Sequence, residues 1–338
     1  MKSISVVTPC YNEELNVLEL YERVRAVFVR LGRYHYEHIF IDNRSTDNTF
    51  AILKHLAEND HNVKVIRNTR NFGHLRSPMH ALLQARGDAV ICLMADLQDP
   101  PEILFDLIAE WEKGVPIVIA IKTQSRESGL MYSIRSFYYR LVRRLSDIET
   151  YEHFTGFGLY DRKVMELVKT FRDPYPYFRG MIAEIGLSHS EVEYEQQRRK
   201  RGKTKNNIFT LYDLAMLGIT SLSKVPLRAV TFTGFAGSAL SFLVGFAYLV
   251  YKLIFWTNFS VGIAPLVIGF FFFGSLQMVF MGIIGEYIGN IHTFAQDRPL
   301  VFESDRINFE YPASAPLVEN EAAAAAATAN APMEYIRS

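Results

Sequence analysis

The sequence predicts an α/β protein that combines a doubly wound, mostly parallel sheet with an apolar C-terminal unit. Over residues 1–121, five short apolar runs rich in β-branched residues alternate with amphipathic helical patterns, which is typical of such a sheet. Further along, residues 229–285 contain one charged side chain, Lys252, although the whole chain of 338 residues carries 36 basic and 36 acidic side chains. The zero net charge is therefore an average over a charge-rich body and an almost charge-free segment.

The elements of the predicted sheet follow in order along the chain. Each strand is a short apolar run, and each helix carries apolar residues at intervals of three and four. Ligands of such sheets bind beyond the carboxyl ends of the strands. The predicted strands are residues 3–8, 36–42, 63–67, 89–94 and 115–121, and the predicted helices are residues 13–31, 47–58, 75–86 and 101–112.

Two more helical patterns follow the fifth strand. Residues 131–145 are basic and amphipathic, and both packing against the sheet and lying on an anionic membrane surface remain open for them. Residues 208–222 are nearly apolar all round. Because the apolar unit comes next, we expect an interfacial amphipathic helix over residues 208–227.

The apolar unit, residues 228–290, predicts two transmembrane helices over residues 229–255 and 262–287. Each exceeds the roughly 20 residues needed to cross a bilayer, and a long buried core hairpin is the alternative. The positive-inside rule places both termini in the cytoplasm, with residues 1–207 as a cytoplasmic domain and 291–338 as a tail that is disordered after about residue 315. The basic residues that flank the unit are Lys224, Arg228, His292, Arg298 and Arg306.

Composition and motifs exclude several classes of protein. Zero net charge argues against a generally basic nucleic-acid binder. Cys10 and Cys92 lie in apolar runs, which predicts buried, reduced thiols rather than a disulfide. The chain has neither the glycine-rich loop of a P-loop nucleotidase nor that of a dinucleotide oxidoreductase.

Carboxylates follow two of the predicted strands at the edge where ligands bind. Asp42 can hold a ribose or base, and Asp96 with the Gln98 carbonyl can hold Mg²⁺ or Mn²⁺, which prefer oxygen ligands and neutralise a diphosphate. Asp99 precedes two prolines and is predicted to cap the next helix. The basic run of residues 196–205 can grip a ligand phosphate, and a solvated juxtamembrane patch is the alternative.

These motifs together resemble the inverting glycosyltransferases of family two, which have the GT-A (Rossmann-like) fold. Within that family, the resemblance is to the polyprenyl-phosphate glycosyltransferases, the dolichol-phosphate mannosyltransferase and bactoprenol glucosyltransferase group. It covers residues 3–309 and rests on four motifs in order, then the basic run and the paired spans. The four motifs are Pro9-x-Tyr11-Asn12-Glu13, residues 42–47 (DNRSTD), residues 70–73 (RNFG) and residues 95–102 (ADLQDPPE).

The resemblance implies a role for each matching position. Asp96 and Gln98 would hold the metal ion, and Arg199 and Lys205 would lie in the basic loop that closes on the diphosphate, so that Asp96, Arg199 and Lys205 form the catalytic group. The residues that would bind the nucleoside are Pro9, Tyr11, Glu13, Asp42 and Asn71.

Three departures distinguish this chain from the family pattern. Asn43 and Arg44 replace the usual Asp-Gly, and Met94 stands where the first Asp of an Asp-x-Asp motif is common. Residues 156–159 read Gly-Phe-Gly-Leu in place of Asp-Phe-Arg-Leu, which removes a carboxylate and an arginine. These changes indicate either a subgroup with another sugar or weakened activity.

The function implied is inverting transfer of a hexose from a nucleotide diphosphate sugar, with UDP-glucose favoured, to a polyprenyl (undecaprenyl) phosphate. The expected product is a lipid-linked monosaccharide for cell-envelope glycan modification, made at the cytoplasmic face of a bacterial plasma membrane by a multi-pass protein. No nucleic-acid partner is expected, and assembly into homo-oligomers stays open. The alternatives are a processive polysaccharide synthase and a non-catalytic scaffold that binds nucleotide sugar.

Overall fold

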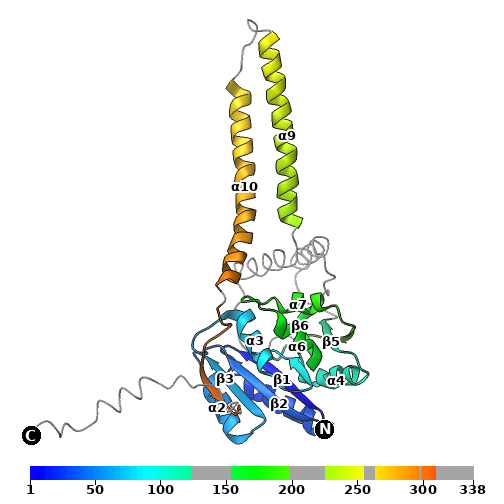
Figure 1. The fold of residues 1–338 in the computed structure, drawn as a ribbon. Coiled ribbons are helices and arrows are strands. Elements are labelled where there is room, and N and C mark those ends of the chain that lie inside the picture. The colour runs from blue at the N-terminus through cyan, green and yellow to red at the C-terminus, as the bar shows by residue number, and fades with distance from the viewer. Residues whose placement is uncertain (123–153, 198–224, 255–262, 297, 310–338) are drawn as a thin grey trace, which may run out of the picture.

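The protein consists of an α/β body from which two long helices extend (Figure 1). The structure is a computed structural model and describes residues 1–122, 154–197, 225–254, 263–296 and 298–309. The predicted helices at residues 131–145 and 208–222 lie outside the described residues. Arg199, Lys205 and the tail after residue 315 lie outside them too.

The described strands form one eight-stranded sheet in the order β7-β5-β6-β4-β1-β2-β3-β8. β6 runs antiparallel to β4 and β5, and β8 runs antiparallel to β3, whereas the remaining neighbours are parallel. The mostly parallel sheet is thus confirmed, with β6, β7 and β8 added to the five predicted strands. The strands are β1 Ser3–Cys10, β2 His35–Asp42, β3 Val63–Asn68, β4 Ala89–Cys92, β5 Ile117–Lys122, β6 Phe154–Asp161, β7 His189–Tyr194 and β8 Glu303–Ile307.

Helices cover both faces of the sheet. Successive strand residues point to opposite faces, so Val6 belongs to one apolar cluster and Val7 to the other. The first cluster packs under α1 (Val17–Leu31), α2 (Thr49–Asn59) and α4 (Leu104–Glu112), which follows the short helix η1 (Pro101–Ile103). The second packs under α3 (Gly73–Gln84), α6 (Arg162–Thr170) and α7 (Phe178–Ile185). Because helices cover both faces of the sheet, the polar loops lie at the ends of the strands.

The two long helices are α9 (Val225–Ile254) and α10 (Ile263–Ala295). Two segments, Val225–Val244 and Phe272–Ala295, are long and apolar enough to cross a membrane by length and composition. Neither is buried inside the protein, so the alternative of a buried core hairpin is wrong. At 1.5 Å per residue, helices of 30 and 33 residues are about 45 and 50 Å long, more than the roughly 30 Å of a bilayer core.

The chain returns to the sheet after α10. β8 pairs with the edge of β3, with Val65 opposite Ile307. It lies within residues 291–338, which were predicted as a tail without a strand. Glu303 of this strand accepts hydrogen bonds from Arg306 and lies 2.5 Å from His80 Nε2 on α3. Burial raises the pKa of Glu303, but these two partners outweigh it and lower the pKa to about 2.

Candidate functional site

The polar clusters that follow β1 to β4 converge at one edge of the sheet, as predicted. Their strands are neighbours in the order β4-β1-β2-β3 and are parallel, so their carboxyl ends lie side by side. Three of the loops hold a residue other than glycine in the left-handed region: Asn12 at φ 57°, Arg44 at φ 65° and Leu97 at φ 55°. Such backbone conformations concentrate at functional sites because the surrounding contacts must enforce them.

The loops after β1 and β2 are interlocked. The backbone N–H of Asn12 donates to Ser45 Oγ at 2.9 Å, and the N–H of Thr46 donates back to Asn12 Oδ1 at 2.8 Å. The N–H of Glu13 donates to Thr49 Oγ1 at 2.8 Å. α1 begins at Val17 rather than at residue 13, and α2 begins at residue 49 rather than 47, where Asp47 Oδ1 accepts the Thr49 N–H at 3.0 Å. Glu13 and the half-buried Pro9 and Tyr11 are thereby fixed beside the loop after β2.

Asp42 has no exposed surface. Its carboxylate accepts the backbone N–H of Ser45 at 3.1 and 3.3 Å, and Oδ2 lies 3.5 Å from Arg67 Nε. Burial raises the pKa of Asp42, which the Ser45 bonds and the Arg67 charge offset only partly. Asp42 therefore shapes the turn after β2 from within, and the nucleoside contact predicted for it stays a prediction.

Asn43 connects the ends of β2 and β3. Its Nδ2 donates to Asn71 Oδ1 at 2.9 Å and to Gly73 O at 3.1 Å, while its Oδ1 accepts from Asn68 Nδ2 at 3.0 Å and from the Phe72 N–H at 2.9 Å. An aspartate could accept but not donate here, so the departure from the family's aspartate has a structural reason. The predicted site residue Asn71 is exposed and is held in place by Asn43. Sequence reasoning missed Asn43, although asparagines at adjacent strand ends were the available signal.

The predicted metal ligands lie in the loop after β4. Asp96 is half-buried, and its Oδ1 accepts the Gln98 N–H at 3.2 Å. Among the described residues, no group of three or more His, Cys, Asp and Glu side chains is placed to hold a metal ion. One carboxylate and one amide oxygen nevertheless fit Mg²⁺ or Mn²⁺, because such ions often keep waters and take further oxygens from substrate phosphates. Met94 packs against the second apolar cluster, and its thioether is a poor ligand for either ion.

Asp99 does not cap the following helix, contrary to the prediction. The residue before η1 is Pro100, no side chain forms a cap hydrogen bond there, and Pro101 is the first residue of η1. The 4% exposed Asp99 instead accepts a hydrogen bond from Tyr194 Oη at 2.5 Å, at the end of β7. Its pKa is raised by burial, against the Tyr194 bond that lowers it.

A backbone contact continues this connection between β7 and the loop after β4. The Gln197 N–H donates to Gln98 O at 2.9 Å. The basic run, which continues at residue 198, therefore starts beside the candidate metal loop. Arg199 and Lys205 themselves lie outside the described residues.

The two glycines of β6 explain the third departure. Gly156 has φ 97°, a conformation that side chains rarely adopt, and its carbonyl accepts from Tyr160 Oη at 2.8 Å. A Cβ on Gly158 would lie 2.5 Å from the backbone oxygen of Val118. The aspartate and arginine usual in the family do not fit this strand as it pairs here.

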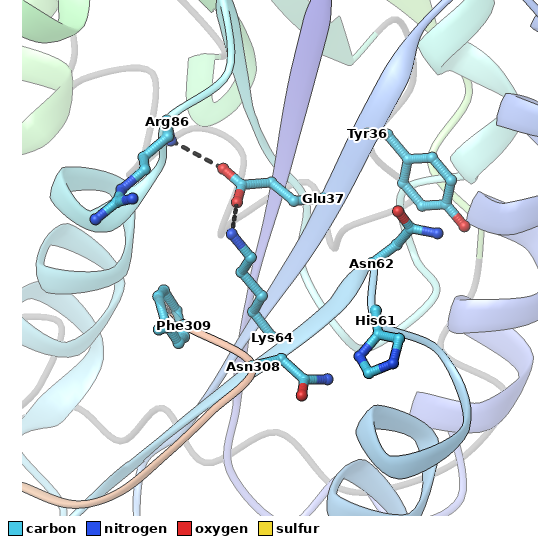
Figure 2. Close-up of a pocket in the computed structure, with 8 residues that line it drawn as sticks. All are labelled: Tyr36, Glu37, His61, Asn62, Lys64, Arg86, Asn308 and Phe309. Atoms are coloured by element: carbon cyan, nitrogen blue, oxygen red, sulfur yellow. Dashed lines mark hydrogen bonds and ion pairs between the residues drawn. The ribbon is translucent and has the colours of Figure 1, made fainter. Parts of the chain in front are cut away.

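A cavity of about 590 Å³ lies elsewhere, near the amino ends of β2 and β3 (Figure 2). Two of its charged groups pair with each other, since Glu37 lies 2.5 Å from Lys64 Nζ, and Glu37 also accepts the backbone N–H of Arg86 at 2.8 Å. Ligands of such sheets bind at the opposite strand ends. The cavity is therefore not the predicted site. Both cysteines are buried and free, as predicted.

The doubly covered mixed sheet with joined polar loops at the carboxyl ends of its strands is that of a GT-A glycosyltransferase domain. Residues 5–168 match the family described as glycosyl transferase family 2. An uncharacterized glycosyltransferase of Bacillus subtilis, YkcC, is 34% identical over 297 residues, which are 88% of this chain and 91% of that protein. The chain belongs to glycosyl transferase family 2.

Further relatives refine this assignment. The bactoprenol glucosyl transferase of Shigella phage SfII is 34% identical over 297 residues, covering 88% of this chain and 96% of its own length. The expected membership in the group of polyprenyl-phosphate glycosyltransferases is thereby confirmed. Among solved structures, glucosyl-3-phosphoglycerate synthase from Mycobacterium tuberculosis has a TM-score of 0.46 at 17% identity, over 65% of this chain and 76% of that one.

Proposed function

We propose that the protein transfers a hexose, from UDP-glucose or a related nucleotide diphosphate sugar, to undecaprenyl or another polyprenyl phosphate at the cytoplasmic face of a bacterial plasma membrane. One observation carries the proposal: a relative named bactoprenol glucosyl transferase matches 88% of this chain. A match of that extent includes both apolar helices as well as the α/β body. The two helices would then span the bilayer from which a lipid-linked acceptor comes.

The nucleoside would bind over the interlocked loops after β1, β2 and β3. Pro9, Tyr11 and Glu13 would form one wall of this site, and the exposed Asn71 the other. Asp42 would act from beneath, because its buried carboxylate fixes the Ser45 turn. This division of roles is supported by the exposed fractions of the side chains.

The diphosphate would bind at the loop after β4. Asp96 and Gln98 would hold Mg²⁺ or Mn²⁺, an ion that supplies charge neutralisation on a leaving diphosphate. Arg199 and Lys205 would contribute cations from the run that begins next to Gln98. The chain's own task is to present these charges where negative charge develops.

The acceptor needs little activation. A phosphate monoester with a second pKa of about 6 is mostly ionised at pH 7, so its oxygen is already a nucleophile. Attack on the anomeric carbon opposite the leaving group forms the new C–O bond as the bond to the diphosphate breaks, which inverts that carbon. A glycine at residue 156 is compatible with this chemistry, because no strong general base is required. Positioning is then the main contribution of the protein.

A donor panel tests the reaction class. The purified full chain is incubated with radiolabelled UDP- and GDP-sugars, undecaprenyl phosphate and Mg²⁺ or Mn²⁺. A lipid-linked monosaccharide is the expected product. Polymer would identify a processive synthase instead, and no product from any donor would favour the non-catalytic scaffold.

The substitution Asp96→Ala tests the site. We expect transfer to fall by at least about 10²-fold, because the only carboxylate of the proposed metal site is lost. The thermal midpoint should stay within a few degrees of wild type. Asp106→Ala, an exposed carboxylate on α4, is the matched control and should keep full activity. Near-normal transfer in Asp96→Ala would show that the metal site is wrongly assigned.

A further inference from the structure

Three arginines gather where α10 meets the α/β body. Arg70 follows β3, Arg76 lies on α3, and Arg298 follows α10, which ends at Ala295. We call Arg70, Arg76 and Arg298 the neck cluster. Neither the nucleoside site nor the metal loop described above includes any of them.

Phe72 and Pro299 bring the neck cluster together. The guanidinium groups of Arg70 and Arg76 lie over the Phe72 ring, 4.1 and 5.4 Å from its centroid. Arg76 Nη2 donates to Pro299 O at 2.7 Å, next to Arg298 in the chain. The ring is 6% exposed, so it forms an apolar floor under two cations.

The charges of the neck cluster are uncompensated within the part of the chain that the structure describes. No ion pair of its three arginines is found among the described residues. Arg76 Nε is buried and has no hydrogen-bond partner there. Burial lowers the pKa of Arg76, the charge of Arg70 and more weakly that of Arg298 lower it further, and Tyr175 opposes them, so both other arginines lie near enough to act on Arg76. Like charges held together in this way favour binding of an anion.

The position of the neck cluster indicates which anion. Arg298 lies just beyond the apolar segment that ends at Ala295, and Arg70 is joined directly to Asn71 at the edge of the nucleoside site. A lipid phosphate that leaves the bilayer along α10 would meet these arginines before it reaches the cleft. Guanidinium groups match phosphate oxygens in a bidentate geometry.

We propose that the neck cluster binds the phosphate of the polyprenyl acceptor and guides it from the membrane to the cleft. The proposal rests on the proposed function and deepens it, since it names a phosphomonoester on a lipid as the ligand of these arginines. Arg70, Arg76 and Arg298 are thus acceptor-binding residues, separate from the groups that hold the donor.

Steady-state kinetics of the full chain in nanodiscs test the proposal. Arg70→Gln and Arg298→Gln should each raise the KM for undecaprenyl phosphate about tenfold, while the KM for the donor sugar nucleotide changes less than about threefold. Arg76→Lys should retain more acceptor affinity than Arg76→Gln, because it keeps the charge. Arg30→Gln, an exposed arginine on α1, is the control and should behave as wild type. Arg70 and Arg298 are exposed, so their substitution tests the cluster even where Arg76→Gln does not fold.

A binding measurement separates this proposal from the proposed function. The full-chain protein and its Arg70→Gln/Arg298→Gln variant are mixed with phosphatidylcholine vesicles that contain undecaprenyl phosphate or, separately, phosphatidylglycerol. Loss of binding in the variant for undecaprenyl phosphate alone supports the cluster, even if no sugar is transferred. Equal loss for both lipids would indicate general attraction to anionic membranes and overturn the proposal, as would unchanged binding or a rise in donor KM alone.

Discussion

Replacing Asn43 with the family's aspartate should destabilise this protein. The two side chains have the same shape, but Asn43→Asp removes both N–H donors and places a carboxylate oxygen about 3 Å from Asn71 Oδ1 and Gly73 O. Two lost hydrogen bonds and a charge at a 7% exposed position cost about 2–4 kcal/mol in the free energy of unfolding. For a domain of this size the thermal midpoint should fall by roughly 5–12 °C.

Thermal unfolding of the detergent-solubilised full chain measures this loss, followed by tryptophan fluorescence between pH 4 and 8. Burial next to two acceptor oxygens disfavours the ionised carboxylate. The pKa of the introduced Asp should therefore be higher in the folded variant than in the unfolded chain. The penalty should thus be smallest near pH 4, the ordinary aspartate value, and grow as the pH rises. Asn48→Asp, an exposed asparagine whose side chain makes no cap bond, should change stability by less than about 0.5 kcal/mol. A pH-independent loss, or equal losses in both variants, would refute this reasoning.

Two further substitutions test β8 and β6. Glu303 has a lowered pKa of about 2, so its bonds with Arg306 and His80 stabilise the fold above the ordinary glutamate pKa of about 4.3 and are lost as the pH falls toward 2. Glu303→Gln should lower the free energy of unfolding by about 2–3 kcal/mol at pH 7, and the variant should lose less further stability than wild type as the pH falls from 4 to 2. The same loss of stability over this pH range in both proteins would contradict this prediction. Gly158→Ala should lower the free energy of unfolding by at least about 3 kcal/mol or prevent folding, because its Cβ would lie 2.5 Å from a backbone oxygen of β5. In the control, Gly237→Ala on α9, the added Cβ meets nothing within 4 Å. Size-exclusion chromatography after heating should therefore give a monodisperse peak for Gly237→Ala, as for wild type. A stable Gly158→Ala protein would show that β6 pairs differently.

Five strands were predictable because a fully covered strand is a run of apolar, β-branched residues. β8 was not, because Glu303–Ile307 reads ESDRI and becomes a strand only through its pairing with β3. β6 contains two glycines that lower its own strand propensity, and neighbouring strands impose its conformation. α1 starts at Val17 rather than at residue 13, and the residues before it form a turn that bonds to the loop after β2, a contact that no helical pattern reveals.

The location of the site in the fold could be predicted from the sequence, but the contacts of its side chains could not. Parallel strands bring their carboxyl ends together, so the convergence of the four loops followed from the order of strands and helices. The direction of each side chain did not follow. Asp99 had the spacing of a helix cap, yet its carboxylate accepts a hydrogen bond from Tyr194, 95 residues further along the chain. Asp42 had the expected position but no exposed surface.

The pairing of β3 with β8 sets an order of events in the life of the chain. Glu303 is synthesised after both apolar helices, so the edge of β3 stays open while those helices leave the ribosome. An open strand edge is a site for chaperones, proteases and aggregation. A chain whose synthesis stops before the second apolar helix has been inserted into the membrane therefore keeps an unpaired edge at β3. Closure of that edge would act as a checkpoint, which only a fully synthesised chain can pass.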